Sequence, residues 1–166
     1  MKRSISALCI LISHLLFFAA CGQAVPPAAP AEFSAEAQVS FGESEFTALV
    51  TQERPGALEL TFTAPAELAG LRLRLQSGNA TLHYGELQAE LPASALPASN
   101  VAALLSGVLL RLAQSSPEGL ARARGGGWTL TGHANGLPYQ AVIDADGILT
   151  QISAPAAGLE VILSQP

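Results

Sequence analysis

Apolar and polar residues alternate along much of the chain after residue 32. From Phe33 to Phe41 every second residue is apolar, and the residues between them are Ser, Glu or Gln. The same period of two recurs at 46–50, 58–62 and 71–75. Because successive side chains of a strand point to opposite faces of a sheet, each run predicts a strand with one buried face, as antiparallel sheets have.

Turn-forming residues separate these predicted strands. Gly42, Pro55–Gly56 and Ser77–Gly78–Asn79 lie between consecutive runs, and such residues favour tight turns. Asp144-Ala145-Asp146-Gly147 is interpreted as a hairpin turn between two later strands. These later strands are predicted at 128–132, 139–143, 149–153 and 159–163.

One segment, between Pro97 and Pro117, has a helical period instead. Its apolar residues are spaced at i, i+3, i+4, i+7, i+8 and i+11, which predicts an amphipathic helix. Ser99 or Asn100 is the expected N-cap, and Arg111 suits the C-terminal end. The predicted buried face consists of Val101, Leu104, Leu105, Val108, Leu109 and Leu112. The other face is small enough for a close backbone approach, with Ala102, Ala103, Ser106 and Gly107.

Strands, one helix and further strands predict an α+β fold over residues 32–166. We expect a strongly curved antiparallel β-sheet with one main amphipathic helix on its concave face. About 135 residues are enough for one domain with a proper core. The apolar rows could fill the interior completely or leave an apolar cavity, and the sequence leaves both open.

The first 21 residues resemble a bacterial lipoprotein signal. Lys2 and Arg3 precede an apolar run from Ile5 to Phe18, and two alanines lead into Cys21. Phe18 stands where Leu is commonest in such signals. The resemblance implies that residues 1–20 are a signal peptide and that Cys21 is acylated, carrying diacylglycerol and palmitate.

Two alternatives remain for this segment. It could be an ordinary signal peptide cut nearby, with Cys21 incidental, or a retained membrane anchor. The apolar run of roughly 14–16 residues is shorter than the roughly 20 that span a bilayer. Cys9 is the only other cysteine and would be removed with the signal peptide. Cys21 would then be the single thiol of an exported domain, and acylation would block it. Residues 21–31 are rich in Pro and Ala and predict an extended tether.

The net charge of the mature chain limits the classes of partner that it can bind. Lys2 and Arg3 would leave with the signal, so six of eight basic residues would stay against 13 acidic ones, a net charge of −7. This charge argues against nucleic acid and against binding anionic headgroups through basic residues. Membrane attachment would then come from an N-terminal diacylglyceryl cysteine.

No catalytic constellation is found in the mature chain, which we expect not to be an enzyme. It contains no lysine for a Schiff base or phosphate loop and no Gly-x-Ser-x-Gly elbow. His83 and His133 show no metal-ligand spacing, so no metal site is predicted. Asp144-x-Asp146-Gly147 lacks the later ligands of a calcium loop, and Gly125–Gly127 is interpreted as a hairpin connection.

Two segments, 64–73 and 77–84, resemble LolA-like half-barrel proteins. They contain a Pro-x-x-Leu-x-Gly turn (Pro65–Gly70), a short strand, and a glycine turn into a strand that ends near Tyr84. The resemblance implies a curved sheet with a helical lid over an apolar cavity. Relatives carry lipoproteins or glycolipids, or sense envelope stress by binding acyl chains. The residues that we place at the cavity wall are Phe33, Phe41, Phe46, Phe62, Leu104 and Leu109.

We therefore expect a non-enzymatic lipoprotein that binds or carries a lipid, a lipoprotein or another apolar ligand. It would sit at the outer face of the plasma membrane, or in the outer membrane of an organism with two, with which Gly22 after the cysteine is compatible. The alternative is a surface accessory module that docks on a membrane-protein partner and has no ligand. The sequence identifies neither the ligand nor such a partner.

Overall fold

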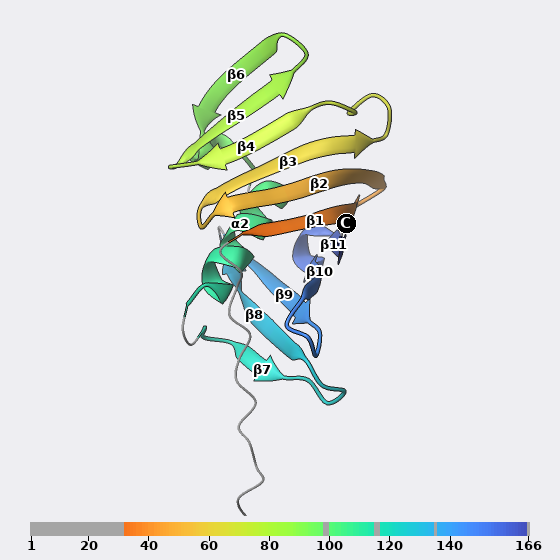
Figure 1. The fold of residues 1–166 in the computed structure, drawn as a ribbon, viewed down its shortest axis with the longest axis vertical. Helices are drawn as coiled ribbons and strands as arrows, with labels where there is room; N and C mark the ends of the chain where they lie inside the picture. Colours follow the sequence, from red (N-terminus) through yellow and green to blue (C-terminus); the bar gives the residue numbers. More distant parts are fainter. Residues whose placement is uncertain (1–31, 98–99, 115–116, 135, 166) are drawn as a thin grey trace, which may run out of the picture.

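The computed structural model describes residues 32–97, 100–114, 117–134 and 136–165. The predicted signal peptide, Cys21 and the tether at 21–31 lie outside the described residues. The described part forms one sheet and one α-helix (Figure 1). The strands are β1 (Phe33–Phe41), β2 (Ser44–Arg54), β3 (Ala57–Ala64), β4 (Arg72–Gln76), β5 (Asn79–Tyr84), β6 (Leu87–Pro92), β7 (Leu120–Arg122), β8 (Trp128–Ala134), β9 (Leu137–Ile143), β10 (Leu149–Ala154) and β11 (Leu159–Ser164). The helices are α2 (Val101–Leu112) and two 3-10 turns, η2 (Ala93–Ala95) and η3 (Pro155–Ala157).

The sheet has 11 strands in the order β6-β5-β4-β3-β2-β1-β11-β10-β9-β8-β7. Every pairing in it is antiparallel, which confirms the predicted α+β class. The strands predicted from alternation correspond to β1–β4 and β8–β11, and the strand ending near Tyr84 that the resemblance implied is β5. The alternation matches the burial: in β1 the first four apolar positions are buried and the residues between them exposed. No strand was predicted for β6, a six-residue strand, or for β7, which has only three residues; both are largely exposed.

The sheet curves around α2. The helix contacts β3 and β4 in the N-terminal half of the sheet and β8 in the C-terminal half. In the sheet order β3 and β8 are six strand spacings apart, which is roughly 29 Å in a flat sheet. A helix of 12 residues is only about 18 Å long and about 10–12 Å wide. It can reach both strands only if the sheet bends toward it, as predicted for the concave face.

The inner face of the sheet and one face of α2 form the core. All six apolar positions predicted to lie on the buried side of the helix are buried. Across the sheet, directly opposed residues extend this face in rows, such as Ala35, Val50, Leu60 and Leu73, each at most 5% exposed. Hydrophobic burial between the helix and the two halves of the sheet is the main favourable term in such a fold.

Asn100 is the N-cap of α2. Its Oδ1 accepts hydrogen bonds from the backbone N–H groups of Ala102 at 3.0 Å and Ala103 at 3.2 Å, which satisfies two of the donors that a helix start leaves free. The other residue proposed for this position, Ser99, lies outside the described residues.

The small face of α2 allows the predicted close approach. A Cβ placed at Gly107 would lie 3.0 Å from the Cβ of Ala134 at the end of β8. Ala103 and Ser106, on the same side of the helix, border open space. Gly107 is therefore the point at which the helix backbone lies against the C-terminal half of the sheet.

The turn at 144–147 joins β9 to β10, as predicted. Asp144 Oδ1 accepts hydrogen bonds from the N–H groups of Asp146 at 3.0 Å and Ile148 at 2.8 Å, so this carboxylate stabilises the turn. Gly125–Gly127 lies in the hairpin between β7 and β8, also as predicted. Gly127 has φ +71°, and a Cβ there would overlap the carbonyl oxygen of Ile143.

We expect Gly107→Leu to lower the free energy of unfolding by about 1–3 kcal/mol, because the added side chain has to push α2 away from β8. Urea unfolding followed by circular dichroism measures this change. Ser106→Leu is the matched control: it adds a similar volume one residue away, toward open space, and should have a much smaller effect. Equal losses from both variants would contradict the close approach.

Candidate functional site

An apolar hollow of about 280 Å³ lies between the sheet and the N-terminal end of α2. The ends of β1–β4 form one wall, and the turn after β3 and the start of the helix form the others. Its lining residues are Phe41, Phe46, Leu60, Phe62, Leu68, Leu73, Pro97, Asn100, Val101 and Ala102. We call this hollow the phenylalanine pocket.

Two rings form the floor of the phenylalanine pocket. The centroids of Phe46 and Phe62 are 5.2 Å apart with the planes tilted by 41°, a favourable geometry for an aromatic pair. Both rings are half-buried, and Phe41 is 39% exposed. Three aromatic side chains are thus only partly covered, although they lie on the inner face of the sheet.

Among the described residues of this lining, Asn100 has the single polar side chain. Its Oδ1 is used by the helix cap, so its Nδ2 amide is the side-chain donor left for another acceptor. None of the described lining residues carries a formal charge. The pocket therefore combines an apolar wall with one neutral hydrogen-bond donor, the composition of many small-molecule sites.

The six residues placed at a cavity wall from the sequence fall into two groups. Phe41, Phe46 and Phe62 line the phenylalanine pocket. Phe33 lies at the opposite end of β1, and Leu104 and Leu109 lie in the middle of the helix; the exposed fractions of all three are 8% or less, within the packed core. The second group therefore belongs to the packed core and does not line the pocket.

Sequence reasoning missed the residues that close the pocket. Leu68 belongs to the Pro65–Gly70 turn after β3, and Pro97 and Asn100 precede the helix. The sequence contained a signal for Leu68: an apolar residue inside a turn does not belong to an alternating strand and often covers a neighbouring apolar surface.

A larger hollow, about 900 Å³, lies at the opposite ends of strands β3 and β4 from the phenylalanine pocket. It is bordered by the β4–β5 turn, by η2 and by the small face of α2, including Ala103, Ser106 and Gly107. Its wall mixes polar turn residues with small helix residues, and no side chain in it is both large and apolar except Leu75, Leu96 and Leu110. It offers fewer anchoring groups for an apolar ligand than the phenylalanine pocket.

A polar cluster marks the C-terminal end of α2. Arg111 forms an ion pair with Glu118, with 3.4 Å between Nη2 and Oε2. Tyr139, on β9, is 4% exposed, and its Oη has no hydrogen-bond partner among the described residues. Its ring lies over Gly132 on β8, where a Cβ would be 2.8 Å from that Oη. Burial raises the pKa of the Tyr139 hydroxyl, and the positive charge of Arg111 offsets part of this rise.

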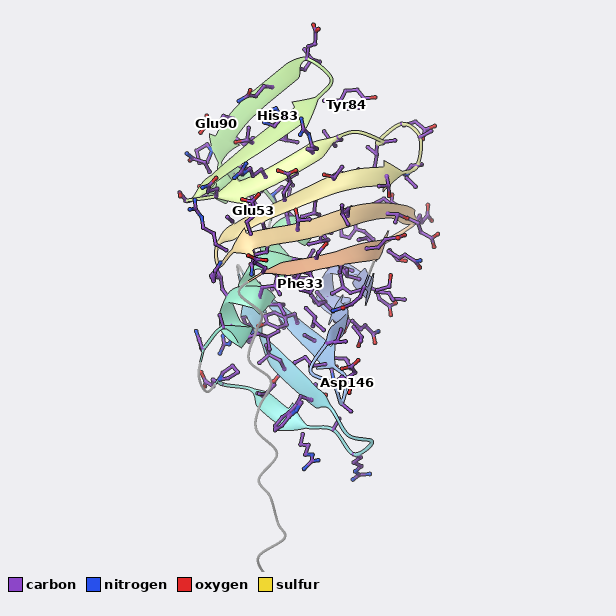
Figure 2. The ribbon with its side chains drawn as sticks, in the orientation of Figure 1. Phe33, Glu53, His83, Tyr84, Glu90 and Asp146 are labelled. Carbon is purple, nitrogen blue, oxygen red and sulfur yellow. The ribbon has the colours of Figure 1, made fainter. Side chains whose placement is uncertain are left out.

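The two histidines are not brought together. His83 pairs with Arg72 and Gln88 on the outer face of β4–β6, and Figure 2 shows it there. His133 is exposed and pairs with Pro138. Among the described residues no group of three or more His, Cys, Asp or Glu side chains could hold a metal ion. No helix in this part of the chain has the length and apolarity of a membrane span.

Comparison with known proteins gives likeness of fold only. No family model and no curated protein match the chain. An uncharacterized conserved protein from Thermus thermophilus has a TM-score of 0.47 and 15% identity, covering 80% of this chain and 77% of that one. A LolA superfamily protein from Nitrosomonas europaea has a TM-score of 0.38 and 9% identity, covering 80% of this chain and 83% of that one. The function has to be inferred from the chain's own residues.

We expect Tyr139→Phe to leave the free energy of unfolding at neutral pH unchanged or to raise it by up to about 1 kcal/mol, because the hydroxyl is buried without a partner among the described residues. The unfolded tyrosine ionises near pH 10 whereas the folded one stays protonated to higher pH. Its contribution to stability is therefore complete below about pH 10 and is lost as the pH rises further. Urea unfolding at pH 7 and near pH 11 should show a smaller alkaline loss for the variant; a large loss already at pH 7 would contradict this assignment.

Proposed function

We propose that this chain is a non-enzymatic, membrane-anchored bacterial lipoprotein that binds an apolar chain of a lipid or lipoprotein in the phenylalanine pocket. The observation that supports it is the pocket itself. Partly exposed aromatic side chains face a hollow on the concave side of the sheet. Such exposure leaves apolar surface in water, and a bound apolar chain would cover it at a gain of about 0.8 kcal/mol per buried methylene.

The dimensions and chemistry of the pocket favour a slender, uncharged segment. Its volume of about 280 Å³ is at the lower end of the roughly 300–1,000 Å³ typical of ligand sites. No charged side chain lines the pocket in the part of the chain that the structure describes, so a buried ionic headgroup would lack a partner there and would cost several kcal/mol. An acyl chain, with its polar end near the Asn100 amide, fits both limits.

The anchor is part of the same proposal. Acylation of Cys21 would hold the domain at the outer face of the plasma membrane, or in the outer membrane of an organism with two. The tether at 21–31 would span about 34 Å when extended at ~3.1 Å per residue, which would let the pocket reach lipids near the bilayer surface. Attachment through lipid rather than basic residues is consistent with the negative charge of the chain.

Native mass spectrometry tests the ligand directly. The chain from residue 21 onward, with Cys21→Ser to prevent acylation, retains every described residue and can be purified from a bacterial host. We expect a fraction of it to carry a co-purified molecule with an acyl chain, released on denaturation and identified by its mass. Protein without any such molecule, and without binding of added lysophosphatidylcholine, would contradict the proposal.

A pocket-filling variant tests the position of the site. Leu68→Trp places a large ring at the rim of the pocket and should weaken binding of a fluorescent palmitoyl probe by about tenfold or more, because the ring occupies the volume that the chain needs. Leu49→Trp is the matched control: Leu49 is 38% exposed and lies in β2, on the outer face. Equal binding by the two variants, with both folded by circular dichroism, would place the site elsewhere.

A further inference from the structure

The inner face of the sheet remains apolar beyond the helix. Leu73 on β4 is opposed by Leu82 on β5, which is opposed by Ala89 on β6. Tyr84 and Leu87 form the next opposed pair of the same face. The helix contacts β3 and β4, whereas Figure 1 shows β5 and β6 extending past it. Alternation along β5 and β6 therefore places four apolar side chains on a face that α2 does not cover.

Exposure rises steadily along this face. Leu73 is 5% exposed, Leu82 is half-buried, Tyr84 is 48% exposed and Leu87 is 73% exposed. The largest exposed fraction of any large apolar residue in the described part thus belongs to the edge strand. We call Leu82, Tyr84, Leu87 and Ala89 the β5–β6 strip; Figure 2 shows Tyr84 at the end of β5.

The strip is continuous with the phenylalanine pocket. Leu73 lines the pocket and is the direct neighbour of Leu82 in the sheet. On the next row Phe62, also a lining residue, donates its backbone N–H to the carbonyl of Leu71 at 2.9 Å. Leu71 immediately precedes β4 and, by alternation with Leu73, shares its face. An apolar path therefore leads from the pocket along the inner face to Tyr84 and Leu87.

We propose that the β5–β6 strip is the outer half of the ligand site and holds the part of a long single acyl chain that the pocket cannot contain. This rests on the proposed function, and it adds a second surface to the site and the length of the acyl chain that the site binds. The pocket is smaller than most ligand sites, so a long chain has to leave it. The strip is the apolar surface that the chain meets on leaving, and its narrowness, two strands wide, favours one chain over a protein partner.

Chain-length dependence tests this ligand class. Lysophosphatidylcholines with saturated chains from octanoyl to octadecanoyl, below their critical micelle concentrations, are titrated against the Cys21→Ser chain. Each methylene that enters the pocket should lower Kd about fourfold. On the strip, where protein covers one side of the chain, we expect about a twofold gain per methylene. A Kd that stops falling once the pocket is full would overturn the proposal.

Leu87→Gln tests the strip by itself. We expect it to weaken binding of the octadecanoyl ligand by about three- to tenfold and to leave the octanoyl ligand unchanged, because only the longer chain reaches β6. Ile162→Gln is the matched control: Ile162 is 50% exposed and lies on the outer face of β11, and neither ligand should respond to it. Both are exposed positions where stability should change little.

The outcomes separate this inference from the proposed function. Weaker octanoyl binding in Leu68→Trp together with full octadecanoyl binding in Leu87→Gln would leave the pocket in place and overturn the strip. Failure of every ligand to bind the unchanged chain would overturn both. Sedimentation of the unliganded chain as a dimer that Leu87→Gln dissociates would assign the strip to contact between two copies and overturn the proposal as well.

Discussion

The packing of one short helix against two distant parts of one sheet is the constraint on which this structure depends. The inner face of β3 and β4 and the end of β8 both have to reach α2, and the sheet can satisfy both only by bending. Gly107 is where this requirement is tightest, because its backbone lies against Ala134. A flat sheet would leave half of its apolar rows in water.

The same constraint leaves part of the inner face uncovered. A helix of 12 residues covers the middle of an 11-stranded sheet but not all of it. At its N-terminal end the side chains of Phe41, Phe46 and Phe62 extend past the helix and border a hollow. The three aromatic residues thus lie where the helix begins and its cover of the sheet ends. The pocket forms because the helix is too short to cover the whole inner face of the wide sheet.

The sequence predicts the fold better than it predicts the pocket. Alternation identified β1–β4 and β8–β11 because each has one buried and one solvated face, and the six-residue helical pattern identified α2. Phe41, Phe46 and Phe62 could be placed on the inner face for the same reason. The pattern could not distinguish them from Phe33 or Leu104. Periodicity gives the buried face of a strand or helix, but it does not give which end of that face the neighbouring element covers.

The residues that alternation could not place are those whose position depends on tertiary contacts. Leu68 follows a proline turn and covers the pocket from outside any strand. Strand β6 was missed although its residues 87–91 alternate between apolar and polar. Most of them are exposed in the structure, because the helix does not cover this edge of the sheet, and alternation alone does not give that exposure. Tyr139 was placed in a strand, but the position of its hydroxyl beside Gly132, with no hydrogen-bond partner among the described residues, depends on the register between β8 and β9.

In the part of the chain that the structure describes, the sheet bends without closing, and β6 and β7 are its two edge strands. Each presents unpaired backbone groups that could pair with another chain. Strand β7 has only three residues and ends in Arg122, and Arg124 follows it. Strand β6 ends in Pro92, which has no N–H to donate, and carries Glu90, which accepts a hydrogen bond from Asn79 Nδ2 at 3.1 Å. Short length, charge and proline at these edges are the features by which natural sheets resist edge-to-edge aggregation. The chain can therefore keep an open, apolar concave face without offering its neighbours a strand to extend.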